Sequence, residues 1–456
     1  MKRRHSTKAL ASFDHQYVWH PFTQMQEWMK ENPIIIERAE DVYLYDTNGR
    51  RYLDGTSSIW VNVHGHRHPK IDQAIRRQLK KVAHSTMLGL ASPPAILLAQ
   101  KLIALAPVGL TKVFYSDDGS TAMEVAMKMA IQYWRQCNVP VKSKKKFVHL
   151  SQAYHGDTVG GMSVSGVELF QQPFHPVLFE SHEIPHPHCY RCPLNLTYPS
   201  CKIDCLRLLE RLLQQKHQEI AGVIIEPMVQ AVAGVIPSPP GYLKRVHELC
   251  EKFHVLLIAD EVATGFGRTG TMFACEHEAI TPDLMAISKG LTGGYVPLAA
   301  TFSTEKIFGA FLGEYGDWKT FFHGHSYTGN PIGCAAALAN LEIFEEERTL
   351  KKLKKKIRLL DELLRPLKNE PIVGDIRQIG LMVGIELVKN KKTKTPFQLT
   401  DRMGHRVAKE CQKRGLLIRP IGNVLVLLPP LSVNSRNLRK MVKIVEQAIQ
   451  FVQNGI

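Results

Sequence analysis

The sequence lacks any apolar run long enough to cross a membrane. No stretch of the 456 residues approaches the ~18 consecutive apolar residues that a spanning helix needs. The basic start, MKRRHSTKALASFDHQ, is not followed by the apolar segment that a secretory signal requires. We therefore expect a cytoplasmic protein without a membrane partner.

A disulfide framework is also missing, because the nine cysteines are odd in number and scattered along a large chain. Four of them cluster with the spacing C-x2-C…C-x3-C, which could hold a structural zinc ion: Cys189, Cys192, Cys201 and Cys205. The alternative is a proline-rich segment of reduced thiols before the next helix. We favour reduced thiols and expect no metal site, because only eight residues separate the two pairs and no catalytic role requires a metal.

Acidic residues are few relative to basic ones, and the formal net charge is +16. Such an excess raises nucleic acid as a partner. The lysines, however, gather in short clusters at positions 142–146, 351–356 and 389–394, without interleaved aromatic residues. We therefore favour a solvated basic surface that helps to attract anionic ligands, and expect no nucleic-acid partner. A nucleic-acid-binding protein is the alternative from a different class, and it predicts salt-sensitive binding of DNA or RNA.

No internal repeat or low-complexity segment interrupts the chain, whose length suggests two or three domains. Short apolar runs alternate with amphipathic helical segments, which is typical of an α/β fold with a mostly parallel sheet. Strands are expected at 113–115, 147–150, 222–225, 255–259, 284–287 and 297–302. Short N-terminal strands with a hairpin turn at Asn48-Gly49, and C-terminal strands at 376–387, 416–419 and 424–428, predict a smaller α+β region.

Two of the expected strands end on residues that carry chemistry. Asp260 and Glu261 follow the run 255–259, and Lys289 follows the run 284–287 between Ser288 and Gly290. A doubly wound sheet builds its site at such strand ends, and this pair suggests pyridoxal phosphate chemistry. In that chemistry the lysine holds the cofactor as a Schiff base and the acid keeps the pyridine nitrogen protonated. From this stretch alone, a buried acid and a surface lysine are the alternative.

Other residues fit the same site. Gly119 and Ser120, in the turn before a helix, can hold a phosphate, although a plain helix cap is the alternative. Tyr154, just beyond a strand, can stack on a planar ring, and Trp60 can line an apolar pocket; ordinary packing is the alternative for both. Arg419 is suited to binding a carboxylate, or it is a surface residue.

The segment Gly265 to Gly270, GFGRTG, superficially matches the dinucleotide motif G-x-G-x-x-G. Its glycines do not open a helix directly after a strand, and no suitable acid follows in a βαβ unit. We therefore expect no dinucleotide site.

Nine motifs occur in the order seen in one known family: WHPFTQM, DGTSSIWVNVHGH, YSDDGSTAMEVAMKMA, AYHGDT, IIEPMVQ, LLIADEVATGFGRTG, SKGLTGG, HGHSYTGNP and IRPIG. From about residue 13 to 450 the chain resembles the class III (subgroup II) pyridoxal phosphate-dependent aminotransferases. The resemblance implies the α/β transferase fold of type I. It places the N-terminal arm and part of the small domain at 1–61, the large cofactor-binding domain at 62–335 and the rest of the small domain at 336–456.

The resemblance also assigns roles to residues. Lys289 is the Schiff-base lysine and the general acid/base, and Asp260 pairs with the pyridine nitrogen. The other implied cofactor contacts are Gly119, Ser120, Tyr154, His325 and Ser326, and the implied substrate contacts are Phe22, Trp60, Tyr154, Lys289, Gly324 and Arg419. Residues 324–326 correspond to a loop that the partner subunit contributes in family members, so a homodimer with shared active sites is expected.

Within the family the chain looks like the members that convert 8-amino-7-oxononanoate to 7,8-diaminononanoate in biotin biosynthesis. In those members Arg419 corresponds to the arginine that binds the oxononanoate carboxylate, and S-adenosylmethionine is the amino donor. L-lysine as donor, or another ω-aminotransferase activity, is the alternative. Two departures concern the substrate side: Phe22 stands where some members have tyrosine, and Ile59-Trp60 stands where some have a Trp-Trp pair.

Overall fold

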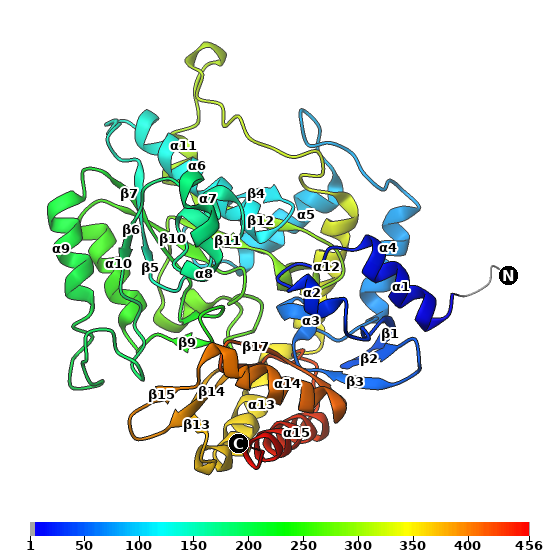
Figure 1. The fold of residues 1–456 in the computed structure, drawn as a ribbon. Helices are drawn as coiled ribbons and strands as arrows, with labels where there is room; N and C mark the ends of the chain where they lie inside the picture. The colour runs from blue at the N-terminus through cyan, green and yellow to red at the C-terminus, as the bar shows by residue number, and fades with distance from the viewer. Residues whose placement is uncertain (1–4, 456) are drawn as a thin grey trace.

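A computed structural model of the protein describes residues 5–455 and is built around a seven-stranded sheet (Figure 1). In spatial order the strands are β4 (Leu110–Ser116), β12 (Ala299–Thr304), β11 (Leu284–Ile287), β10 (Leu256–Asp260), β7 (Ile220–Ile225), β5 (Lys146–Leu150) and β6 (His182–Ile184). Neighbours from β11 to β6 pair in parallel, whereas β12 is antiparallel to β11 and to β4. The expected mostly parallel sheet is thereby confirmed.

The apolar runs explain the centre of this sheet. Every residue of β7, β10 and β11 is buried, because helices cover both faces of a parallel sheet and leave no polar side to a strand. These three strands run in the same direction, so their carboxyl ends meet at one edge. Asp260 is the last residue of β10, and Lys289 comes two residues after β11. The strand pairing therefore brings the two sequence-predicted residues to the same edge.

Most of the helices lie between the N-terminus and residue 346. Asp118 caps α6, where its carboxylate accepts the N–H of Thr121, and Asn330 caps α12 in the same way. The helices from the N-terminus to α12 are α1 (Thr7–Tyr17), α2 (Met25–Trp28), α3 (Ser57–Trp60), α4 (Pro69–Leu79), α5 (Pro93–Leu105), α6 (Gly119–Gln136), α7 (Val159–Ser163), α8 (Glu168–Gln171), α9 (Leu206–Lys216), α10 (Tyr242–Lys252), α11 (Glu305–Gly309) and α12 (Pro331–Glu346).

The smaller part combines both ends of the chain (Figure 1, blue and orange to red). One sheet joins β1 (Ile36–Glu40), β2 (Tyr43–Asp46) and β3 (Arg51–Asp54) to β16 (Leu416–Leu417), which pairs in parallel with β3. The other sheet and its helices comprise β13 (Val373–Ile379), β14 (Met382–Asn390), β15 (Thr395–Pro396), β17 (Arg419–Ile421), β18 (Val424–Leu427), α13 (Thr349–Leu364), α14 (Met403–Lys413) and α15 (Ser435–Gln453).

Short elements complete the chain. A small ladder pairs β8 (Val229–Gln230) with β9 (Ile236–Pro237). The 3-10 turns are η1 (Gln172–Val177), η2 (Ala274–Glu278), η3 (Lys289–Thr292), η4 (Tyr315–Asp317), η5 (Pro366–Asn369) and η6 (Leu399–Asp401). None of the helices in residues 5–455 is both long and apolar enough to cross a membrane.

Two expected strands were wrong in detail. The segment 416–419 is divided between β16, which pairs with β3, and β17, which pairs with β18 in the other sheet. The segment 376–387 is not a single strand but the hairpin of β13 and β14, which turns at Gly380. Gly380 has a φ of +57°, and a Cβ there would lie 2.1 Å from the carbonyl oxygen of Arg268. The turn therefore requires glycine for its conformation and for its close approach to residue 268. The domain boundaries at residues 61 and 335 stay predictions.

Candidate active site

A cavity of about 490 Å³ lies at the carboxyl ends of β7, β10 and β11, within the size range of small-molecule sites. Five residues predicted from the sequence line it: Gly119, Ser120, Tyr154, Asp260 and Lys289. They come from four separate segments of the chain, which the sheet brings together. The cavity lining does not include the other predicted residues, Phe22, Trp60, Gly324, His325, Ser326 and Arg419.

Asp260 is almost completely buried and makes two hydrogen bonds. Its Oδ2 lies 2.7 Å from Nδ1 of His155, and its Oδ1 accepts the backbone N–H of Val262 at 3.0 Å. The His155 side chain is fully buried, and its Nε2 has no hydrogen-bond partner among the described residues. His155 was not predicted from the sequence. Its position between Tyr154 and Gly156, just after β5, was the signal that could have identified it.

Lys289 begins η3 with a left-handed backbone, φ +42°. Its Nζ lies 5.1 Å from the ring centroid of Trp60, so Trp60 reaches the lysine without lining the cavity. The residue keeps some surface exposed where it lines the cavity, but the protein encloses its amine. Burial lowers the pKa of this amine, the charge of Arg268 adds to the effect, and Asp260 and Glu226 oppose it.

Glu226 follows β7 and is a second buried carboxylate at the cavity. Its oxygens accept the N–H of Ala231 at 2.9 Å and of Tyr154 at 3.3 Å. Burial raises the pKa of Glu226 to about 7; the charge of Asp260 contributes to this rise, whereas His155 and the N–H groups of Ala231 and Tyr154 oppose it. Glu226, Asp260 and Lys289 therefore line the same cavity.

The N-terminus of α6 forms the opposite end of the cavity. Asp118 is the N-cap, so the alternative reading of Ser120 as a plain helix cap was wrong. The backbone closes tightly around this point: a Cβ at Gly156 would lie 2.2 Å from Oγ of Ser120, and one at Gly119 would lie 2.5 Å from Val262. Free N–H groups at the first turn of a helix suit an anionic group such as a phosphate.

An aromatic row leads outward from the cavity. The rings of Tyr154 and Phe170 meet edge to face at 6.3 Å, and those of Phe170 and Phe22 at 5.2 Å. Arg419 lies at the outer end, where its Nη2 donates a long hydrogen bond of 3.4 Å to the carbonyl of Phe22. The structure thus brings Phe22, Tyr154 and Arg419 together. Phe170 was missed, because nothing in its local sequence distinguishes it from a packing residue.

Residues 324–326 lie on a long loop that projects from the body of the protein (Figure 1, top). The Nδ1 of His325 lies 3.4 Å from a carboxylate oxygen of Asp117, which lines the cavity. Several aromatic side chains on and beside this loop are exposed, among them Tyr315, Trp318, Phe322 and Tyr327. Their role in a partner subunit's site stays a prediction.

All nine cysteines are free thiols. The four clustered cysteines line a small separate cavity with His186 and His188. In residues 5–455, the possible metal ligands that lie close together, within 4.8 Å of one another, belong to His188, Asp375 and Glu386 and not to the cysteines. Ion pairs with Arg377 already compensate both of these carboxylates. The zinc alternative therefore gains no support from this geometry.

The residues present fit pyridoxal phosphate. Its phosphate suits the N-terminus of α6, its ring nitrogen suits the carboxylate that His155 holds, and its carbonyl carbon suits the amine of Lys289. The buried imidazole of His155 contacts Asp260 through Nδ1, and its Nε2 has no partner among the described residues. The three groups face one cavity from different sides, as a planar ring with a phosphate arm requires.

Comparisons with known proteins agree with this site. Residues 24–449 match the family model described as aminotransferase class-III. The chain is 53% identical over 443 residues to the adenosylmethionine-8-amino-7-oxononanoate aminotransferase of Nitratidesulfovibrio vulgaris, covering 97% of this chain and 82% of that protein. The crystal structure of the enzyme of the same name from Methanocaldococcus jannaschii superposes with a TM-score of 0.92 at 45% identity, covering 97% of this chain and 99% of that one.

A more distant structure supports the cofactor. An amine transaminase from an uncultivated Pseudomonas species, in its PLP-bound form, superposes with a TM-score of 0.91 at 35% identity and covers 95% of this chain and 98% of that one. The match to the family model spans most of the chain and includes the segments that supply Asp260 and Lys289. The chain therefore belongs to the class-III aminotransferases, which are pyridoxal phosphate-dependent transaminases of fold type I.

Proposed function

We propose that this protein transfers an amino group to 8-amino-7-oxononanoate, giving 7,8-diaminononanoate for biotin biosynthesis, with S-adenosylmethionine as the amino donor. The observation that carries the proposal is one cavity that joins Lys289 and Asp260 to an aromatic row ending at Arg419. Relatives at 46–53% identity over nearly the whole chain carry the name of this aminotransferase.

Bound pyridoxal phosphate would supply a carbonyl carbon that binds amines covalently and a ring that accepts electrons. Gly119 and Ser120 would hold its phosphate at the positive end of α6. Asp260 would hold a proton at the ring nitrogen, and the hydrogen bonds from His155 and Val262 orient the carboxylate for this contact. Tyr154 would pack against the ring from the side of β5.

Lys289 would hold the cofactor covalently through its amine. When neutral, the same Nζ would accept and return the proton that transamination moves. Because burial lowers the pKa of this amine, a larger fraction is neutral near pH 7 and can accept that proton. Trp60, 5.1 Å from the amine, limits where the lysine can go once it is released.

Arg419 would bind the carboxylate of the oxononanoate. Its one hydrogen bond is the 3.4 Å contact with a carbonyl, and no carboxylate among the described residues pairs with it. An exposed guanidinium of this kind is available for bidentate binding of a carboxylate. The aromatic rings of Phe22, Phe170 and Tyr154 would line the path of the apolar carbon chain between this end and the reacting carbon.

A homodimer would complete the site. The projecting loop exposes aromatic side chains that a single subunit leaves unpacked, with Tyr315 92% exposed. A second subunit would cover these rings, and Gly324, His325 and Ser326 of this chain would then reach the phosphate end of the partner's cavity. The nine free thiols are typical of the cytoplasm, where we place the protein.

The first test removes the catalytic amine. Lys289→Ala should abolish turnover and the visible absorbance of covalently bound cofactor, because no other amine lines the cavity in residues 5–455. Lys252→Ala is the matched control, since Lys252 is exposed and pairs with Glu210. Turnover and absorbance that both survive in the Lys289 variant would reject the assignment.

The second test decides the substrates. With purified enzyme, S-adenosylmethionine should bleach the cofactor absorbance in a half-reaction; bleaching by L-lysine alone would assign the donor to lysine. Arg419→Ala should raise the KM for 8-amino-7-oxononanoate and leave the donor half-reaction intact. An enzyme that aminates other amine acceptors but fails to rescue a biotin auxotroph would be a different ω-aminotransferase.

A further inference from the structure

The short element α3, Ser57–Trp60, is a left-handed turn without any glycine. Their φ angles are +46°, +41°, +65° and +68°, a region that L-residues rarely adopt. Elsewhere in residues 5–455, non-glycine residues with positive φ occur singly, apart from the pair Lys202 and Ile203. A run of four is therefore a distinct feature of this chain, and contacts outside the run must stabilise it.

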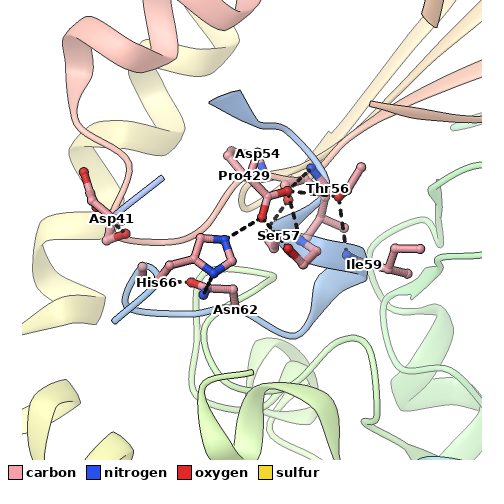
Figure 2. Close-up of polar contacts among 12 residues, drawn as sticks. Asp41, Asp54, Thr56, Ser57, Ile59, Asn62, His66 and Pro429 are labelled. Carbon is pink, nitrogen blue, oxygen red and sulfur yellow. Dashed lines mark hydrogen bonds and ion pairs between the residues drawn. The ribbon is translucent and has the colours of Figure 1, made fainter. Parts of the chain in front are cut away.

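Asp54 supports the turn from one side (Figure 2). Its side chain is completely buried. Its Oδ1 accepts hydrogen bonds from the N–H and the hydroxyl of Thr56 and from the N–H of Ser58, at 2.9 to 3.1 Å. Its Oδ2 accepts the Ser58 hydroxyl at 2.9 Å and lies 3.0 Å from Nε2 of His66. The carboxylate thus engages both the backbone and the side chain of the turn.

His66 is itself held in place. Its Nδ1 lies 3.2 Å from Nδ2 of Asn62, which implies that Nδ1 accepts and Nε2 donates to Asp54. Its backbone pairs with that of Asp41 in both directions, at 2.7 and 3.1 Å (Figure 2). His66 therefore joins the left-handed turn, through its imidazole, to the connection between β1 and β2, through its backbone.

Arg268 supports the turn from the other side. Only 1% of its surface is exposed. Its guanidinium donates to Oγ of Ser57 at 3.2 Å and to the carbonyl of Asn62 at 2.7 Å, so it connects the first residue of the turn to the segment that follows it. It also donates to the carbonyl of Pro429 at 3.0 Å. This arginine belongs to the GFGRTG segment, for which the cofactor contacts provide no role.

Trp60 is the last residue of the turn and the one that reaches the site. Its ring lies between the Lys289 amine, 5.1 Å from the centroid, and an apolar cluster that includes Val229, Met382 and Leu428. A change in the backbone at residues 57–60 would swing this ring away from the lysine. The position of the ring thus depends on the strained turn.

We propose that Asp54, His66 and Arg268 form a clasp that holds the left-handed turn and thereby fixes the ring of Trp60 against the amine of Lys289. The three are positioning residues, because none of them lines the cavity. The inference rests on the proposed role of Lys289 in transamination. The clasp also accounts for an arginine in GFGRTG, because its two terminal nitrogens reach three acceptors at once.

The test compares Asp54→Asn with Asp46→Asn. An amide at position 54 keeps one acceptor oxygen, which can still face the N–H groups of Thr56 and Ser58. Its NH2 group then stands where the Ser58 hydroxyl and Nε2 of His66 donate, so this side of the clasp opens. Asp46 is the matched control, because it is also buried, lies in the same sheet and accepts two backbone N–H groups at 2.9 Å. It holds the hairpin turn at residues 47–50 instead. Both variants should lower the melting temperature.

The deciding measurement is the fluorescence of Trp60 in the cofactor-free protein. The chain has five tryptophans, so each spectrum is compared with that of the same variant carrying Trp60→Phe. Asp54→Asn should shift the Trp60 emission to longer wavelength, increase its quenching by acrylamide and lower kcat by about tenfold or more. Asp46→Asn should leave the emission and kcat of the folded protein unchanged.

An unchanged Trp60 signal in folded Asp54→Asn, or an equal shift in both variants, would overturn the proposal. If Asp54→Asn does not fold, Ser58→Ala takes its place, since it removes one hydroxyl and keeps the carboxylate; the same shift, smaller in size, is then required. The fluorescence readout needs neither cofactor nor substrate. A wild-type enzyme that fails to aminate 8-amino-7-oxononanoate would therefore refute the proposed function, and the fluorescence test of the clasp would still stand.

Discussion

Two turns follow one another along the N-terminal sheet, and one buried aspartate organises each. Asp46 holds the hairpin turn between β2 and β3, where Gly49 has a φ of +79° and open space around it. Asp54 holds the turn after β3, where four residues that are not glycine adopt left-handed backbones. The first turn has glycine at its left-handed position, whereas the second turn has strained backbone at four residues that are not glycine.

The difference between the turns lies in what the side chains do. A left-handed L-residue costs about 1–2 kcal/mol, so the second turn stores several kcal/mol that its contacts must offset. Glycine would remove that cost, but the hydroxyl of Ser57 and the ring of Trp60 both make contacts that glycine cannot make. Strain is thus tolerated where a side chain must be placed at the active site, and avoided where the turn only reverses the chain.

Among these predictions, replacing Arg268, the second support of the strained turn, should have the largest effect on the free energy of unfolding. In Arg268→Lys a single ammonium replaces the planar guanidinium. It cannot reach all three acceptors, which are the carbonyls of Asn62 and Pro429 and the hydroxyl of Ser57. Because buried acceptors lose their donors, we expect a loss of about 3 kcal/mol in the free energy of unfolding. Urea denaturation measures this loss. Arg245→Lys, an exposed arginine that contacts one carbonyl, should change little; equal losses would show that the fork is not needed.

The histidines on either side of Gly65 differ in their hydrogen-bond partners. His66 has Asp54 as a partner, whereas Nε2 of His64 donates to the carbonyl of Asn340 at 3.2 Å. Burial lowers the pKa of His64 to about 3, helped by the charges of His68 and Arg268. Its contribution to stability is therefore present above pH 6.5 and is lost as the pH falls from 6.5 toward 3.

This pH dependence can be measured by difference. We expect wild type to lose up to about 1.4 kcal/mol per pH unit from this histidine between pH 6.5 and 4. His64→Gln keeps a donor for the Asn340 carbonyl and should flatten that part of the curve in urea denaturation. Parallel curves for the two proteins would mean that His64 is not the group that titrates.

The unstrained turn should respond to a side chain at its glycine. Gly49→Ala places a Cβ in open space but at a φ of +79°, so only the backbone preference changes. We expect a loss of about 1 kcal/mol in the free energy of unfolding, with unchanged kcat. Thermal or urea denaturation measures it, and Gly309→Ala is the control, because that glycine also has open space but no positive φ.

The strained turn should respond in the opposite direction. Ile59 has a φ of +65° and is 48% exposed, so its side chain loses little packing when it is replaced. Asparagine tolerates the left-handed region better than a β-branched residue does. Ile59→Asn should therefore raise the free energy of unfolding by about 0.5–1 kcal/mol. A loss of stability would argue that the backbone here is not strained.

Local patterns predicted the strands and the residues that follow them. The runs ending at Ile258-Ala259 and Ile287 were apolar throughout, so buried parallel strands followed from them, and Asp260 and Lys289 fell at the same edge. The hairpin at Gly380 escaped prediction because its need for glycine comes from the approach of Arg268, 112 positions away in the chain. Phe170 escaped because its neighbours Phe22 and Tyr154 are set by packing.

By itself the sequence determined the parallel sheet, the placing of Asp260 and Lys289 after its strands, and the glycine turn beside Asp46. Each of these depends on neighbouring residues or on the period of a strand, which local order encodes. Only the tertiary structure decided that His155 orients Asp260 and that Arg268 and Asp54 hold the turn of Trp60. Those contacts join distant segments, and hydrogen bonds between distant groups form only where the packed core places donor and acceptor together.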